Sequence, residues 1–86
     1  MPEISRFFGI IVAMYYDDHP PPHFHARYGG QKGRFAIDDL RMLDGDLSPR
    51  TRGLVIEWAS QHLDELRQNW ARAEGHAALL PIKPLE

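Results

Sequence analysis

The hydrophobic pattern of the first half of the chain predicts β-strands. Apolar residues fill both the odd and the even positions from Arg6 to Tyr16, which is typical of a strand covered on both faces. The sequence Asp17-Asp18-His19 and the three prolines at 20–22 end this strand, because proline cannot donate to a sheet ladder. A second strand then follows from His23 to Tyr28, where apolar and polar residues alternate.

This alternation gives the second strand one apolar and one polar face. The apolar face carries Phe24, Ala26 and Tyr28, and the polar face carries His23, His25 and Arg27. A turn of about four residues at 29–32 predicts a hairpin, with a returning strand at 33–38. A short fourth strand at 40–43 completes the predicted meander.

The second half of the chain has a helical pattern. Ser48 and Pro49 form a helix start, because serine caps the first turn and proline suits the first helical position. Apolar residues recur at three- and four-residue spacing until Gly75, a C-terminal cap. Residues 77–86 contain two prolines and cannot continue the helix, so this tail either packs back in extended form or offers apolar surface to a partner.

Together these elements predict a single α+β domain over residues 1–86. A three- to four-stranded antiparallel β-meander at 6–43 packs on one long C-terminal α-helix at 49–74, and an extended tail follows at 77–86. A chain of 86 residues buries a limited share of its surface, so we expect a small protein partner or a homo-oligomer.

Composition narrows the location and the chemistry. The chain has no cysteine, which excludes disulfides, thiolate metal sites and a cysteine nucleophile. The longest apolar run, Phe7 to Tyr16, is too short to cross a bilayer, and no signal-peptide pattern precedes it, so we expect a cytoplasmic protein without a membrane partner. With a net charge of −2, any nucleic-acid role requires a local basic patch.

Three of the 5 histidines, His19, His23 and His25, fall within seven residues. His23 and His25 project from the same strand face, about 6.5–7 Å apart at the backbone. His19 lies across a stiff proline bridge and completes a three-nitrogen set, with Asp17 or Asp18 as a carboxylate option. Three histidines with an open fourth position form a catalytic zinc site, so one hypothesis is a divalent-metal site, catalytic or sensory.

The same residues also suit metal-free chemistry. The three histidines are then candidate catalytic acid and base groups, while Arg27 and Arg34 bind phosphate and Tyr28 or Tyr16 stacks on a base. An acid, a base and a cation that binds phosphate are the groups needed to cleave RNA through its own 2′-hydroxyl, so this hypothesis is a ribonuclease-like activity. A third hypothesis has no chemistry: the histidines cap the proline turn of a protein–protein interaction module. The sequence leaves open whether the protein is an enzyme.

The motifs resemble a bacterial family of small proteins that are labelled only as a domain of unknown function. The resemblance spans about Ile4 to Leu85, and its specific part is a His-x-Pro-Pro-His-Phe-His signature at residues 19–25. It also rests on the stretch from Ile4 to Ile10, on Tyr28-Gly29 and on the helical residues 57–70. The resemblance implies no catalytic residues, but it implies a gene beside that of a second small protein, as in toxin–antitoxin pairs. Our first functional hypothesis is therefore a toxin-like or regulatory module that binds a partner protein and RNA.

Overall fold

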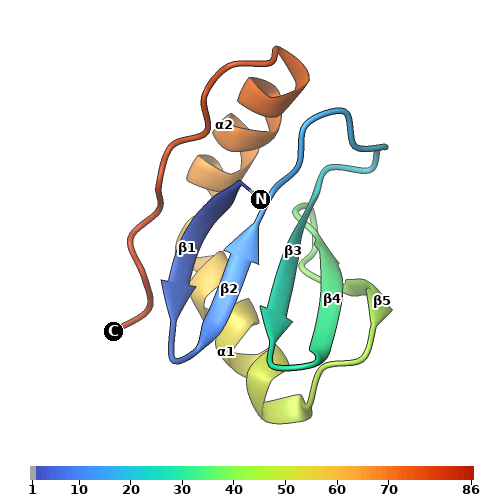
Figure 1. Cartoon of the computed structure of the whole chain (residues 1–86), viewed down its shortest axis with the longest axis vertical. Helices are drawn as coiled ribbons and strands as arrows, with labels where there is room; N and C mark the ends of the chain where they lie inside the picture. Colours follow the sequence, from blue (N-terminus) through green and yellow to red (C-terminus); the bar gives the residue numbers. More distant parts are fainter. Residues whose placement is uncertain (1) are drawn as a thin grey trace.

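A computed structural model gives the fold and describes residues 2–86, which form one antiparallel sheet and a layer of helices behind it (Figure 1). The sheet has five strands in the order of the sequence. The elements are β1 (Glu3–Phe7), β2 (Ile10–Ala13), β3 (His23–Tyr28), β4 (Gln31–Ala36), β5 (Met42–Gly45), α1 (Pro49–Ser60) and α2 (Leu63–Glu74). The predicted α+β meander is confirmed, but the prediction of three to four strands and one long helix is wrong.

The additional strand arises because the apolar stretch 6–16 is a hairpin and not one strand. β1 and β2 are joined by Phe8 and Gly9, whose φ angles are 51° and 80°. Two consecutive positive φ values are typical of the tight turn whose twist matches that of paired strands. Gly9 suits this turn, and a Cβ there would meet the ring of Tyr28 at 3.1 Å. Phe8 is not a usual turn residue, so the turn has no polar signal in the sequence.

The hairpin formed by β3 and β4 is where the sequence predicts the strands best. β3 has the predicted bounds, and its turn is the two residues Gly29 and Gly30, because Tyr28 already pairs with Gln31. Phe24 and Phe35 pair across the two strands, with stacked rings 5.5 Å apart. β5 lies two residues later than predicted, at Met42–Gly45.

The predicted helix at 49–74 is broken into two. Its start is as predicted: the Ser48 side chain accepts a hydrogen bond from the Thr51 amide, and Pro49 is the first helical residue. α1 ends at Ser60, where the amides of Gln61 and His62 bond to the last carbonyls of the helix. No proline or glycine marks this break, and the apolar spacing continues across it because both helices pack on the same sheet face.

The core lies between that sheet face and the helices, and the tail completes it. Residues 77–86 run in extended form beside β1 (Figure 1), where the amide of Ile82 donates to the carbonyl of Ile4 at 2.8 Å. The side chains of Ile82 and Leu85 are buried in the core. The other face of the sheet has no helix on it among residues 2–86, and this open face carries the polar side chains of β3. Within the described residues, no helix has the length and the hydropathy needed to span a membrane.

Candidate metal centre

Three potential metal ligands meet where β3 begins. The Nε2 atoms of His23 and His25 each lie 3.0 Å from the same carboxylate oxygen, Oδ2 of Asp18. The ligand atoms of all three residues lie within 4.8 Å of one another. We refer to Asp18, His23 and His25 as the Asp-His-His cluster.

The loop that connects β2 to β3 gives the cluster its shape. The Pro21 carbonyl accepts a hydrogen bond of 2.7 Å from Nδ1 of His23, which fixes the orientation of that ring. The other carboxylate oxygen of Asp18 accepts a hydrogen bond from the amide of His19, so the carboxylate is also held by the backbone. The Pro20–Pro21 peptide bond in this loop is cis.

The cluster is half-buried, and its burial is uneven. The side chain of His23 is 0% exposed and packs on the ring of Trp70, whereas those of Asp18 and His25 are 22% and 28% exposed. The ring of Tyr15 packs edge-to-face against the ring of His25, with the two centroids 4.6 Å apart. A bound ion would therefore be shielded on the His23 side and accessible to a ligand on the His25 side.

The electrostatics of the cluster favour the protonation states that bind a metal. Burial alone would raise the pKa of Asp18, but hydrogen bonds from His25 and the His19 amide outweigh it and lower that pKa. The pKa of His25 is lowered, mainly by burial of its ring and further by the positive charges of His23 and Arg34, although the hydrogen bond to Asp18 acts in the opposite direction. At neutral pH the cluster therefore presents a carboxylate and a neutral imidazole at His25.

The hydrogen bond between His23 and Pro21 leaves the other ring nitrogen of His23 facing the carboxylate of Asp18. The Pro21 carbonyl can only accept, so the proton of a neutral His23 ring is on Nδ1. Nε2 then carries a lone pair that faces the lone pairs of Oδ2 at 3.0 Å. A metal ion placed between the two atoms would accept a lone pair from each of them.

Comparison with known families places the chain in one of them. Residues 9–71 match DUF4160, a domain of unknown function. The chain belongs to this family. No curated protein and no solved structure matches the chain. The DUF4160 region includes the whole Asp-His-His cluster and ends within α2.

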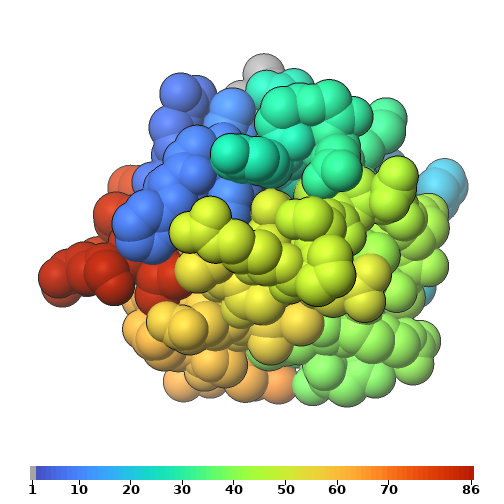
Figure 2. All heavy atoms as spheres, turned by 90° about the horizontal axis from the view of Figure 1, so that it is seen from below, coloured from blue at the N-terminus to red at the C-terminus, as the bar shows by residue number. Residues whose placement is uncertain are grey.

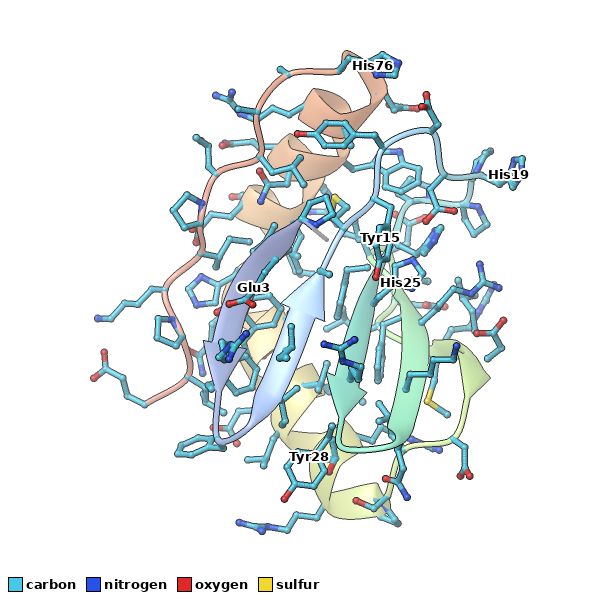
Figure 3. All side chains as sticks on the ribbon, in the orientation of Figure 1. Glu3, Tyr15, His19, His25, Tyr28 and His76 are labelled. Atoms are coloured by element: carbon cyan, nitrogen blue, oxygen red, sulfur yellow. The ribbon has the colours of Figure 1, made fainter. Side chains whose placement is uncertain are left out.

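In this DUF4160 protein, the expected convergence of three histidines is wrong. His19 is exposed and projects away from the sheet at the far end of the proline loop (Figure 3), and it is not in the cluster. The third position is occupied instead by Asp18, one of the two carboxylates that the sequence offers as an alternative ligand. The proline bridge turns the chain so that the residue before His19, and not His19 itself, faces His23 and His25.

The predicted binding residues are spread over the DUF4160 sheet. Arg34 lies directly opposite His25 on β4, where its guanidinium binds the Asp44 carboxylate at 2.6 Å. Arg27 is exposed on β3, and Tyr28 lies at the opposite end of that strand (Figure 3), away from the cluster. Tyr15 touches the cluster but was not predicted, because it sits in an apolar run where no alternation distinguishes it.

Proposed function

We propose that this protein binds a divalent transition-metal ion through Asp18, His23 and His25. The observation that carries the proposal is the pair of Nε2 atoms that face one carboxylate oxygen at 3.0 Å, with the remaining ring nitrogen of His23 bonded to a carbonyl. Histidines that ligate metals donate their other ring N–H to a carbonyl or carboxylate in the same way. When the proton of the His25 ring is on Nδ1, the Nε2 atoms of both histidines and Oδ2 of Asp18 all present lone pairs that one metal ion can accept.

The ligand set indicates which metals fit. Two imidazoles and one carboxylate suit zinc or ferrous iron, whereas calcium and magnesium prefer oxygen ligands. Two histidines with one carboxylate also hold zinc in hydrolytic enzymes, where an open position takes water or substrate. An ion here would supply Lewis-acid chemistry or an activated water.

The geometry favours this metal hypothesis over the metal-free one. When RNA is cleaved through its 2′-hydroxyl, a base and an acid must each come within hydrogen-bond reach of opposite sides of the phosphate. The two Nε2 atoms instead converge on a single carboxylate oxygen, and all the ligand atoms lie within 4.8 Å. This convergence does not place an acid and a base on opposite sides of a phosphate, and His19 lies outside the cluster.

Titration of chelator-treated protein with zinc tests the proposal. We expect one equivalent to bind, and we expect Asp18→Asn and His25→Gln each to lower the affinity by at least about a hundredfold, since even supporting residues of metal sites are worth about 10–100-fold. His25 is the more informative position because its partial exposure makes a folded variant attainable.

The matched control is His19→Gln, which removes a neighbouring but exposed histidine and should leave the zinc affinity unchanged. Circular dichroism verifies that each variant is folded. Two results would refute the metal site: no zinc binding by the wild-type protein, or equal losses in the His19 and His25 variants.

We also propose that a small cytoplasmic protein partner binds this chain, in the toxin–antitoxin-like arrangement that the sequence resemblance implies. The turn ends of the two hairpins and the start of α1 meet at one end of the molecule (Figure 2). Phe8 and Tyr28 are 59% and 46% exposed there, and Phe8 has a left-handed backbone that large side chains rarely adopt. An exposed aromatic at such a position supports a binding role.

The substitution Phe8→Asn tests the partner proposal. Asparagine tolerates a positive φ, so we expect the fold to be retained or stabilised. Binding to the product of the adjacent gene, measured with both proteins purified, should weaken at least about tenfold if Phe8 is an interface anchor. Unchanged binding would exclude this surface.

A further inference from the structure

We propose that the open face of the sheet beside the metal site binds a phosphate group, and that Lys32 is the side chain that pairs with it. This inference rests on the metal site proposed above, whose open coordination position provides the second contact. The ligand is inorganic phosphate or a phosphate ester, and the experiment below distinguishes a free phosphate from an RNA phosphodiester.

The strand register concentrates positive charge on this face. Directly paired residues share a face, so side chains line up in two rows across the strands. The first row consists of Arg6, Ile11, Arg27 and Lys32. The second row consists of Glu3, Ala13, His25, Arg34 and Asp44. The face thus has four cations and two carboxylates, although acidic residues outnumber basic ones in the whole chain, 12 to 10. The open face is therefore a local basic patch in a chain whose net charge is −2.

The two carboxylates on the face already have partners. Glu3 binds Arg6 at 2.7 Å, and Asp44 binds Arg34 at 2.6 Å. Lys32 is exposed and has no ion-pair partner among residues 2–86. Its ammonium group is therefore the cation that an incoming anion can pair with at the least cost.

Two hollows on this face are lined by both Lys32 and His25, one of the three residues of the Asp-His-His cluster. A groove of about 400 Å³ is lined by His25, Lys32, Gly33, Arg34, Asp44 and Gly45. A smaller hollow of about 160 Å³ extends towards β2 and is lined by Tyr15 and Ala13, among others, and again by His25 and Lys32. Figure 3 shows His25 and Tyr15 close together on this open side of the sheet. Because His25 and Lys32 line both hollows, an anion held there lies next to a metal ligand and a lysine.

A phosphate group suits this arrangement better than a carboxylate. Its oxygens are arranged tetrahedrally, so one can take the open metal position while another accepts from Lys32. A phosphate monoester also carries a charge of about −1.5 to −2 at pH 7, which a metal ion and a lysine together balance. The Arg34 guanidinium, held at the edge of the groove by Asp44, adds further positive potential.

The experiment measures anion binding to the zinc-loaded protein by calorimetry and phosphorus NMR. Inorganic phosphate, oligouridylate and acetate are the three probes. We expect both phosphate-containing probes to bind more tightly than acetate, and we expect Lys32→Gln to weaken their binding at least about tenfold without changing the zinc affinity. Lys83→Gln is the matched control, because Lys83 lies in the tail, paired with Glu86.

The outcomes separate this inference from the proposed function. If zinc binds but phosphate binds equally to wild-type and Lys32→Gln protein, or no better than acetate, the phosphate site is overturned and the metal site stands. If zinc does not bind, the metal site itself is overturned, and the phosphate site with it. Tighter binding of oligouridylate than of phosphate identifies an RNA phosphodiester as the ligand, and equal or weaker binding of oligouridylate identifies a free phosphate group.

Discussion

Removal of residues 76–86 is expected to unfold the protein and not merely to dissociate an oligomer. Burial of Ile82 and Leu85 contributes about 1.5–3 kcal/mol for each side chain. The truncation also leaves Asn69 and the Trp58 indole N–H without their carbonyl partners on Leu80 and Lys83, and each buried unpaired group costs about 1–3 kcal/mol. The sum is comparable to the whole stability of a small domain, about 5–15 kcal/mol.

Far-UV circular dichroism and analytical ultracentrifugation on the truncated chain check this expectation. The double substitution Lys83→Gln and Glu86→Gln is the control, because it removes only an exposed ion pair in the tail, and such pairs contribute little. A truncated chain that melts cooperatively near the wild-type temperature, but changes its mass, would instead assign the tail to an oligomer interface. The sequence alone is consistent with that role too, in which the tail offers apolar surface to a partner.

Zinc is expected to raise the melting temperature of the wild-type protein by about 10–20 °C. A ligand at a hundred times its dissociation constant stabilises the folded state by about 2.7 kcal/mol. In a domain of this size, each kcal/mol shifts the melting temperature by about 4–8 °C. Asp18→Asn should abolish the shift, while His19→Gln should retain it. Equal shifts in all three proteins would indicate adventitious binding elsewhere.

The zinc effect should depend on pH in a defined direction. The pKa of His25 in the folded protein is lowered from the ordinary histidine value of 6.5, so its ring is neutral at pH 7. Protons therefore compete with zinc for this ring only at a pH below that ordinary value. In that range the unfolded chain binds more protons than the folded one, so the zinc-free protein also loses stability as the pH falls. The lowered pKa of Asp18 adds a further loss near and below pH 4. Thermal melts from pH 8 to pH 3, with and without zinc, measure the loss of zinc binding and the loss of stability of the zinc-free protein.

The sequence predicts the elements that have a local signal and misses those that do not. β3 alternates strictly, and Ser48-Pro49 is a capping sequence, so both are placed correctly. The turn at Phe8-Gly9 sits in a continuous apolar run, so nothing in the sequence divides it. The helix break at residues 61–62 contains no proline or glycine, and the side chain of His62 caps no helical amide, so no local signal predicts it.

The candidate site was predicted in part for the same reason. Two strand residues at i and i+2 share a face by local geometry, so the convergence of His23 and His25 follows from the alternation. The path of a loop through three prolines does not follow from any local rule. The choice between Asp18 and His19 as the third residue therefore depends on the tertiary structure.

The tail at residues 77–86 is held in place by hydrogen bonds to its main chain. Asn69 binds both the amide and the carbonyl of Leu80, Trp58 binds the carbonyl of Lys83, and the amide of Ile82 binds β1. All four hydrogen bonds use main-chain atoms of the tail, so we expect most of its side chains to be replaceable during evolution without a change in the course of its backbone. The DUF4160 match includes Trp58 and Asn69, whose side chains hold the tail, and it ends at residue 71, before the tail begins.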